Sequence, residues 1–264
     1  MPYTAKDHTF VICAYQENPF LEDCILSVVH QTIHSNIKIS TSTPNEYIAA
    51  LAEKYDLPLV CNPGRGTAVD NMNFAYTQAE TPLVTLCHQD DYYCPNYLET
   101  VLKAADQKNA PIIIFTDYFE DRSGEKVDSN RLLFIKRCLN FPLRFSLFQN
   151  NKWLRRRILS LGSPICCPSV CFCKIQIPEV PFRDIKSCSW DWEAWLRLSA
   201  LDGAFVYCPN KLMAHRIWAD SATTETISNG VRDNEDYEIL SSLWPKPLAK
   251  VIFAIYRRSQ SSNM

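Results

Sequence analysis

The sequence contains little glycine, with six residues among 264. Neither GxGxxG nor GxxxxGK(S/T) occurs, so the chain has no dinucleotide fingerprint and no P-loop, and any bound phosphate must be held by other groups. No apolar run approaches the ~18 residues that a membrane-spanning helix requires. The N-terminus also lacks a basic region followed by an apolar core. We therefore expect a cytoplasmic protein.

Acidic residues are absent between Asp128 and Glu179, although the net charge of the whole chain is only −2. The near-neutral total disfavours a nucleic-acid binder that relies on an overall positive field. The acid-free segment is rich in leucine and phenylalanine and suits an anionic membrane surface or a lipid-linked phosphate; a solvated helix face is the ordinary alternative. Its nine basic residues are Arg131, Lys136, Arg137, Arg144, Lys152, Arg155, Arg156, Arg157 and Lys174.

Cysteine is abundant, with twelve residues. The cysteines are spread through apolar runs of a mid-sized chain, for example at Cys61, rather than concentrated in a short secreted scaffold. We expect buried reduced thiols. The pairs Cys166-Cys167 and Cys171/Cys173 lack the two-residue spacing of paired zinc ligands, so a zinc site is not expected.

The first half of the chain alternates two hydrophobic periodicities. Short apolar runs predict strands, and apolar residues spaced three and four apart predict the helices that follow them. This alternation indicates a mostly parallel sheet covered on both faces, and an apolar content of 47% is enough for its core. The predicted strands are Thr9–Ala14, Ile37–Ser42, Leu59–Cys61, Leu83–Cys87 and Ile112–Thr116; the predicted helices are Pro19–Gln31, Asn45–Tyr55, Ala68–Gln78 and Pro95–Gln107.

The alternation stops near residue 120. The chain has no repeat and no glycine/serine linker, so the second half should complete the same compact domain. We expect a single domain over residues 1–245 and a basic amphipathic tail over residues 246–264. The features predicted for the second half are a basic, aromatic-rich stretch over Arg131–Leu161, a loop and strand over Gly162–Cys173, a helix over Ser189–Leu201, a hairpin over Ala204–Arg216 and a polar helix over Thr223–Leu243.

Polar residues follow the predicted strands, at the edge where such sheets bind ligands. The sharpest cluster is His88-Gln89-Asp90-Asp91, directly after the strand Leu83–Cys87. Its carboxylates could hold a hard divalent cation, which prefers oxygen ligands and bridges substrate phosphates. Alternatively, Asp90 or Asp91 caps the following helix.

A second candidate is the tryptophan-rich helix start around Asp191. Glu193 and Arg197 lie four residues apart and suit an ion pair, whereas Asp191 has no such partner. Neighbouring tryptophans, among them Trp190 and Trp192, could shape a partly dry sugar site and raise the basicity of this carboxylate. The alternatives are that an acid in the first helical turn only favours the helix dipole, and that the tryptophans belong to the core.

The dipeptide His215-Arg216 ends another apolar run. The arginine fork could bind phosphate. Adjacent strand residues point to opposite faces, so only one of the two should face a site.

Taken in order, these residues resemble the inverting glycosyltransferases of family 2, especially the bacterial enzymes that build cell-surface polysaccharides. The resemblance covers almost the whole chain. Val11–Tyr15 resembles the first strand, which receives the nucleotide base, and Gly66–Asn73 resembles the loop and helix start beside the donor. His88-Gln89-Asp90-Asp91 stands where the family has its DxD-type motif, and Asp191 falls on the family's general base.

The resemblance implies an α/β fold of the GT-A type, with a Rossmann-like, mostly parallel sheet, flanking helices and C-terminal helices on the acceptor side. Residues 1–120 would form the nucleotide-sugar-binding half and residues 121–245 the acceptor-binding half. The implied cofactor is Mn²⁺ or Mg²⁺, and the implied partners are a nucleotide-diphosphate-sugar donor and a glycan or lipid-linked acceptor. The basic segments would make peripheral contact with the inner face of the cell membrane.

The predicted site residues combine the resemblance with the local patterns. The segment Gly162–Ser169 should line the acceptor pocket, because its small polar residues and prolines suit a shaped loop, and a turn before a core strand is the alternative. We assign catalysis to Asp191, the metal to Asp90 with His215 as a further candidate, donor binding to Ala14, Tyr15, Glu17, Thr41, Asp70, Asn73, His88, Gln89 and Asp90, and acceptor binding to Ser163, Ser169, Trp190 and Trp192.

The implied reaction is a single displacement with inversion at the anomeric carbon. Asp191 would remove a proton from the acceptor hydroxyl while the cation on Asp90 stabilises the departing diphosphate. Two alternatives stay open. A sugar nucleotidyltransferase also presents nucleotide-binding loops and a metal-binding aspartate at strand ends. A catalytically inactive carbohydrate-binding module would have His88 as the mark of a decayed metal site.

Overall fold

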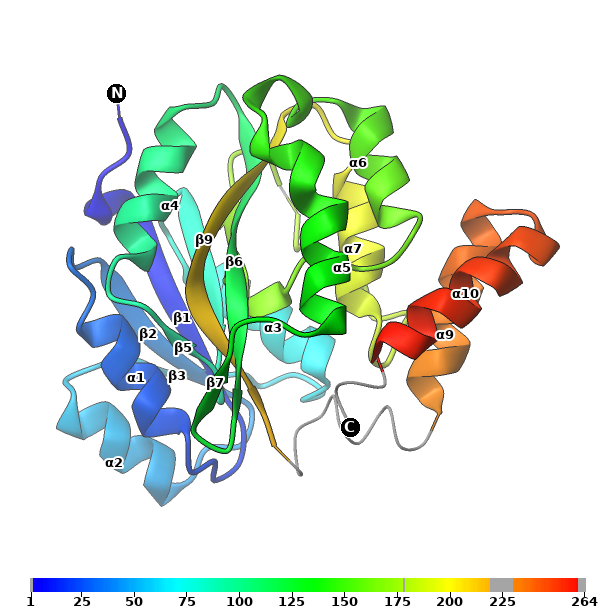
Figure 1. Ribbon diagram of the computed structural model, residues 1–264. Helices are drawn as coiled ribbons and strands as arrows, with labels where there is room; N and C mark the ends of the chain where they lie inside the picture. Colours follow the sequence, from blue (N-terminus) through cyan, green and yellow to red (C-terminus); the bar gives the residue numbers. More distant parts are fainter. Residues whose placement is uncertain (1, 178, 219–229, 261–264) are drawn as a thin grey trace.

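The computed structural model describes residues 2–177, 179–218 and 230–260, and its centre is a nine-stranded sheet (Figure 1). The strand order is β3-β2-β1-β4-β8-β6-β9-β5, and β7 pairs with β6. The predicted mostly parallel sheet is confirmed: β3, β2, β1 and β4 run parallel, as do β6 and β9, whereas β8 is antiparallel to β4 and β6. The strands are β1 His8–Ala14, β2 Asn36–Thr41, β3 Leu59–Cys61, β4 Leu83–His88, β5 Tyr92–Tyr93, β6 Pro111–Arg122, β7 Glu125–Val127, β8 Val170–Cys173 and β9 Ala204–Ile217.

Helices cover both faces of the sheet, and two of them, α9 and α10, stand to one side of it (Figure 1). Within the described residues, every helix is too short or too polar to cross a bilayer. The helices are α1 Leu21–Val29, α2 Glu46–Lys54, α3 Ala68–Gln78, α4 Tyr97–Asp106, α5 Arg131–Asn140, α6 Lys152–Leu159, α7 Trp190–Leu198, α9 Val231–Leu243 and α10 Lys246–Gln260, with short 3-10 helices η1 Ala5–Asp7, η2 Phe141–Arg144, η3 Ser146–Phe148 and η4 Cys167–Ser169.

The core consists of two apolar clusters, one on each side of the sheet. Alternate residues of β1 enter opposite clusters, because successive side chains of a strand point to opposite faces. Phe10 and Ile12 join the cluster that α1, α2 and α4 cover, whereas Val11 joins the cluster that α3, α6 and α7 cover. Burial on both faces explains why β1 and β4 appear in the sequence as continuous apolar runs.

Strand β6 runs well past the predicted strand Ile112–Thr116, so the prediction of a strand end before Asp117 was wrong. The residues beyond it include carboxylates, which are typical of a loop, yet they are buried. Each has a cationic partner: Arg137 Nε lies 2.7 Å from Asp117 Oδ2, and Arg122 Nε lies 2.9 Å from Glu120 Oε2. Paired charges can be buried where unpaired ones cannot, and the strand therefore continues.

The hairpin predicted over Ala204–Arg216 was also wrong. These residues form the single strand β9, which pairs with β6 along its length. The sequence Pro209-Asn210 favours a turn, but the structure accommodates it as a bulge, where the register shifts between Thr116 and Asp117 of β6. As a result, His215 and Arg216 lie on the same strand as Ala204 and at its opposite end.

The C-terminal helices follow the predicted pattern in part. The polar helix expected over Thr223–Leu243 is present from Val231, and residues 223–229 lie outside the described residues. The expected tail forms α10, in which Ala249 and Tyr256 are buried, and residues 261–264 lie outside the described residues. Cys61, expected to be buried, is exposed at the end of β3, which lies at the edge of the sheet.

A buried arginine joins α6 to the chain that follows α7. Arg155 is 1% exposed, and its guanidinium donates to the carbonyl groups of Gly203 at 2.6 Å, Ser199 at 2.9 Å and Leu201 at 2.9 Å. The guanidinium also lies 4.8 Å from the ring centre of Phe205. These carbonyl groups belong to the segment between α7 and β9, so the arginine supplies donors to backbone acceptors of a connection that has no regular hydrogen-bond ladder.

We expect Arg155→Met to lower the free energy of unfolding by about 3 kcal/mol or more, because it leaves several buried carbonyl groups without a donor. Urea unfolding followed by circular dichroism measures this change. The exposed neighbour Arg156 provides the matched control, since Arg156→Met should change the stability by no more than about 0.5 kcal/mol. Equal midpoints for the two variants would contradict the structural role of Arg155.

Candidate active site

The loops that follow β1 and β4 are tied together by the amide of Gln89. Its Oε1 accepts from the backbone N–H of Tyr15 at 2.8 Å, and its Nε2 donates to the carbonyl of Tyr15 at 3.0 Å. Ala14 is buried at the end of β1, whereas the ring of Tyr15 and the side chain of Glu17 are exposed. Four of the predicted donor-binding residues therefore lie together at the carboxyl edge of the parallel strands.

Thr41 lies at the same edge, at the end of β2. Its buried hydroxyl accepts from the backbone N–H of Thr43 at 3.0 Å. The hydroxyl of Thr43 in turn accepts from the backbone N–H of Gln16, at 2.5 Å; Gln16 has a left-handed φ of 53°. These bonds fix the loops after β1 and β2 against each other.

Asp70 organises the loop between β3 and α3. Its Oδ2 accepts from the amide of Asn62 at 2.8 Å and from the backbone N–H of Gly66 at 3.1 Å. A side chain at Gly64 would collide with the same carboxylate, so the loop requires glycine there. Asp70 thus shapes the loop beside the predicted donor site.

Asn73 faces the segment that precedes α7. Its side chain exchanges two hydrogen bonds with the backbone of Phe182: Nδ2 donates to the carbonyl at 2.9 Å, and Oδ1 accepts from the N–H at 3.1 Å. Because both ends of the amide are engaged, we leave Asn73 out of the donor residues proposed below.

His88, Asp90 and Asp91 gather at the end of β4. One possible ligand atom from each residue lies within 4.8 Å of the other two. His88 Nε2 and Asp91 Oδ2 are buried and have no hydrogen-bond partner in the described part of the chain. A buried polar atom without a protein partner usually contacts an ordered water or a bound ion, and here two such atoms belong to one cluster of ligand types. Two carboxylates and an imidazole fit Mn²⁺, and the carboxylates alone fit Mg²⁺.

Asp91 is held in place by the end of β9. Its Oδ1 accepts from the backbone N–H of Arg216 at 2.9 Å and lies 3.1 Å from Nδ1 of His215. Burial opposes protonation of His215, but Asp91 and Asp90 together raise its pKa above the ordinary value. His215, predicted as a metal ligand beside Asp90, therefore contacts the cluster through Asp91.

Asp90 has a different partner. The indole Nε1 of Trp218 donates to its Oδ2 at 3.0 Å, and the Trp218 ring lies 5.4 Å from that of Phe20. Burial and then the charge of Asp91 raise the pKa of Asp90 above its ordinary value. A divalent cation reverses this effect, because it stabilises both carboxylates in their charged form.

Asp191 lies in the first turn of α7, where its Oδ1 accepts from the backbone N–H of Trp192 at 2.7 Å. Burial raises the pKa of Asp191, while the charges of Arg232, Lys136 and His88 oppose the increase. A charge on His88 also lowers the pKa of Asp90. Both carboxyl groups therefore lie within electrostatic reach of the same imidazole.

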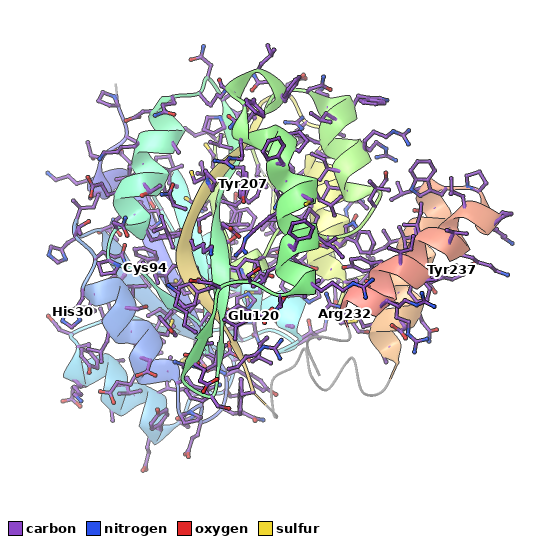
Figure 2. All side chains as sticks on the ribbon, in the orientation of Figure 1. His30, Cys94, Glu120, Tyr207, Arg232 and Tyr237 are labelled. Atoms are coloured by element: carbon purple, nitrogen blue, oxygen red, sulfur yellow. The ribbon has the colours of Figure 1, made fainter. Side chains whose placement is uncertain are left out.

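Two basic side chains that lower the pKa of Asp191 come from helices in different parts of the chain. Lys136 extends from α5 and donates to the hydroxyl of Tyr118 at 2.9 Å, and burial lowers its pKa. Arg232 extends from α9 and lies between the two C-terminal helices and the rest of the molecule (Figure 2). The acid-free segment and the C-terminal helices thus both supply positive charge to the surroundings of Asp191.

Helix α9 also holds the backbone immediately before Asp191. The carboxylate of Glu235 accepts from three successive backbone N–H groups, those of residues 187–189, at 2.6, 3.0 and 2.9 Å. Asp236 accepts from the hydroxyl of Ser189 at 2.7 Å and pairs with Arg232 at 3.7 Å. Burial raises the pKa of Asp236 to about 6. The start of α7 is therefore fixed by side chains of α9.

The residues predicted to bind the acceptor fall into two groups. Ser169 is fully buried and donates to the carbonyl of Cys166 at 2.7 Å. Trp190 and Trp192 are also buried, and the indole of Trp192 donates to a carbonyl of α6. These contacts favour the alternatives, a turn before a core strand for Ser169 and a core position for the two tryptophans, and the three residues are not part of the proposed acceptor site. Ser163 has a buried hydroxyl with no partner in the described residues and stays in the proposed set.

Sequence reasoning named Asp91 only as one of the two carboxylates of the motif, and it gave Lys136, Arg232 and Glu235 no place in the site. Asp91 belongs to the recognised motif, and its neighbour Asp90 was preferred only because of the motif's spacing. Arg232 and Asp236 are four residues apart, a spacing typical of an ion pair on a helix. No local signal marks Lys136 or Glu235, because their partners lie on other elements.

This edge of the sheet combines the parts that a group transfer from a diphosphate requires. Loops with polar side chains follow three parallel strands, and a cluster suited to a divalent cation adjoins them. The carboxyl group of Asp191, whose pKa is raised, lies within electrostatic reach of His88 and is suited to accept a proton.

Comparison with known proteins gives one family. The model described as glycosyl transferase family 2 matches residues 9–169, which is more than half of the chain. A search of the curated proteins found no match.

Solved structures match over nearly the whole chain. S. aureus TarS 1-349 gives a TM-score of 0.61 at 12% identity and covers 97% of this chain and 72% of that chain. Mannosyltransferase PcManGT from Pyrobaculum calidifontis, in complex with GDP-Man and Mn²⁺, gives 0.62 at 13% identity, with 97% and 70% covered. Glucosyl-3-phosphoglycerate synthase from Mycobacterium tuberculosis, in complex with Mn²⁺, UDP and phosphoglyceric acid, gives 0.58 at 13% identity, with 89% and 78% covered. The predicted GT-A fold is confirmed.

The cluster at the end of β4 predicts metal binding by the protein alone. Calorimetric titration with Mn²⁺ should show one site, and Asp91→Asn should weaken it at least tenfold, because it removes a ligand charge while keeping the acceptor for Arg216. Asp23→Asn is the control, since this exposed carboxylate also contacts Arg216 but lies outside the cluster. Equal affinities for the wild type and Asp91→Asn would contradict the assignment.

Proposed function

This chain belongs to glycosyl transferase family 2, and we propose that it moves a sugar from a nucleotide-diphosphate sugar to an acceptor hydroxyl with inversion at the anomeric carbon. The observation that carries the proposal is the half-buried Asp191, whose carboxyl group has a raised pKa. The charge of His88, a member of the cluster at the end of β4, acts on both Asp191 and Asp90. The family also favours a transferase over the nucleotidyltransferase alternative.

The proposed donor site is the carboxyl edge of β1, β2 and β4. The structures of similar fold include complexes with UDP-GlcNAc, GDP-Man and UDP-glucose, which supports a nucleotide sugar as the donor. The loop shaped by Asp70 would flank the bound nucleotide. The donor-binding residues that we propose are Ala14, Tyr15, Glu17, Thr41, Asp70, His88, Gln89 and Asp90.

We propose that Asp90, Asp91 and His88 hold Mn²⁺ or Mg²⁺, with His215 orienting Asp91. Mn²⁺ in three of the structures of similar fold supports this choice. When bound, the cation supplies positive charge that stabilises the leaving diphosphate. His215 and the N–H of Arg216 keep Asp91 Oδ1 engaged, so that Oδ2 stays directed to the cluster.

In the proposed reaction, Asp191 accepts the proton of the acceptor hydroxyl as that oxygen forms a bond to the anomeric carbon. The bond from this carbon to the diphosphate oxygen breaks, and the nucleoside diphosphate leaves with the electron pair. Burial favours the protonated product form of Asp191, while Arg232 and Lys136 keep the carboxylate available beforehand. Glu235 holds the start of α7 and thereby the direction of the base.

The acceptor-binding half would extend over residues 121–245, with Ser163 facing the acceptor. We propose a glycan or lipid-linked acceptor in cell-surface polysaccharide biosynthesis, at the inner face of the cell membrane. The acid-free segment and the basic residues of α10 support membrane contact by their charge.

A screen of nucleotide sugars for slow hydrolysis by the protein identifies a donor. Asp191→Asn should lower the rate of this hydrolysis by about a hundredfold or more, because general-base catalysis contributes about 10²–10⁴-fold. Donor affinity, measured by calorimetry with Mn²⁺, should stay nearly unchanged.

Glu193→Gln is the control for this test. Glu193 lies on the same helix and contacts Arg183 and Arg197 at ion-pair distance, so its loss should leave hydrolysis within a few-fold of the wild type. Parallel loss of hydrolysis and donor binding in Asp191→Asn would make the aspartate structural. Binding of a free glycan without metal, and no hydrolysis of any donor, would favour the inactive carbohydrate-binding module.

The pH dependence of donor hydrolysis should follow the ionisation of the Asp191 carboxyl group. The carboxyl must be ionised to accept a proton, so the rate rises with pH through its raised pKa. Arg232→Met removes a positive charge that lowers this pKa, and should move the acidic limb of the rate profile upward by about one pH unit. Arg232→Lys keeps the charge and should restore the limb. An unmoved limb in Arg232→Met would show that the limb reports another group.

A further inference from the structure

Exposed apolar side chains are concentrated in one short part of the chain. Of the fourteen large hydrophobic residues that are exposed in the described structure, half lie between residues 134 and 161. Five of them follow one another around η2, η3 and the start of α6, and we call them the aromatic face: Phe141, Phe145, Leu147, Phe148 and Trp153.

The aromatic face is held in its exposed conformation. Leu143 and Gln149 between these residues are buried, and the amide of Gln149 donates to the carbonyl of Leu143 at 2.9 Å. The carbonyl of Gln149 accepts from the N–H of Phe205 at 3.0 Å. These anchors leave the rings on the outside, where neighbouring phenylalanines lie 5.6 and 6.3 Å apart between ring centres.

Positive charge surrounds the aromatic face. The guanidinium of Arg144 lies 5.8 Å from the ring centre of Phe141, and that of Arg157 lies 5.7 Å from Trp153. Arg156 adds a further exposed cation. The acid-free segment contributes no carboxylate here, and Lys152 pairs with Asp202, which lies outside this segment. The surface therefore complements an anionic, partly apolar surface.

We propose that the aromatic face docks on a lipid bilayer that contains anionic lipids. Phenylalanine, leucine and tryptophan beside arginine and lysine are typical of protein surfaces that lie at the headgroup level, where the rings enter the acyl boundary and the cations meet the lipid phosphates. An exposed apolar surface of this kind requires a covering partner, and the excess of positive charge selects the bilayer among the possible partners.

The position of the aromatic face gives the bound protein an orientation. The N–H of Phe205, at the start of β9, donates to the carbonyl of Gln149, the residue after η3. Lys108, just before the start of β6, donates to the backbone of η3. These starts lie at the edge of the sheet opposite the end of β4, because β6 runs parallel to β4 through the antiparallel β8. The six residues of β4 alone separate the two edges by ~20 Å.

Docking by the aromatic face therefore directs the carboxyl edge of the parallel strands away from the bilayer. This step rests on the proposed function: the acceptor hydroxyl would stand clear of the headgroups, as at the growing end of a glycan, and not on the first sugar attached to a lipid. The geometry of docking therefore favours a glycan end over a sugar attached directly to a lipid as the acceptor.

Sedimentation with vesicles tests the docking. The wild-type chain should sediment with vesicles of phosphatidylglycerol and phosphatidylcholine, and much less with phosphatidylcholine alone. The combined variant Phe145→Ser, Leu147→Ser and Trp153→Ser should bind the mixed vesicles at least tenfold more weakly, because it removes exposed apolar area. Arg144→Gln and Arg157→Gln should each weaken binding about fivefold, and added salt should do the same.

The control is the double variant Ile175→Ser and Ile185→Ser, which removes equally exposed apolar side chains elsewhere and should bind as the wild type does. All variants should hydrolyse the donor at the wild-type rate in solution, which separates a failure of docking from a failure of the proposed function. Hydrolysis should also persist on the vesicles, since the catalytic edge is directed outward.

Three results would overturn the proposal. The first is equal vesicle binding by the wild type and the aromatic-face variant. The second is no vesicle binding together with self-association that the variant abolishes in sedimentation velocity, which would make this face a contact between copies of the chain. The third is salt-sensitive binding of RNA in preference to the mixed vesicles. Loss of hydrolysis on vesicle binding would overturn the outward orientation alone.

Discussion

A carboxylate taken out of water must meet a cation or a hydrogen-bond donor, and this requirement links the distant parts of the chain. Asp91 at the end of β4 receives the N–H of Arg216 and the ring of His215 from β9. Asp191 at the start of α7 lies in the field of Lys136 from α5 and Arg232 from α9. Elements outside the sheet therefore supply charge to these carboxylates, and α9 contributes to the surroundings of Asp191.

The same requirement gives the site its chemical asymmetry. The cluster at the end of β4 holds two carboxylates close together, and two of its buried atoms have no partner among the described residues, which favours a bound cation. Asp191 instead has opposing influences on its pKa, from burial and from neighbouring positive charge, which suits a group that exchanges a proton. Glu235 adds mechanical constraint, since it accepts three consecutive backbone bonds just before α7. In this proposal His88 belongs to the cation site and acts electrostatically on the base.

The two edges of the sheet differ in character as well. The carboxyl edge of the parallel strands is polar, whereas the opposite edge carries the aromatic face around η2 and η3. Arg155 and Gln149 are buried beneath this face. Gln149 bonds to the start of β9, and Arg155 bonds to Gln149 and to the residue after α7. The acid-free segment thus serves two structural purposes: Arg155 and Lys136 are directed inward, and Arg144 and Arg157 lie outward.

Local periodicity and the order of residue types were enough to predict the alternation of strands and helices in the first half, the mostly parallel sheet and the motif at the end of β4. They did not determine the length of β6, the continuity of β9 or the burial of Trp190 and Trp192. Asp117 and Glu120 resemble loop residues until Arg137 and Arg122 pair with them, and Pro209-Asn210 resembles a turn until β6 pairs on both sides of it. The length of β6, the continuity of β9 and the burial of the two tryptophans follow from tertiary contacts, because each depends on a partner that is distant in the sequence and close in the fold.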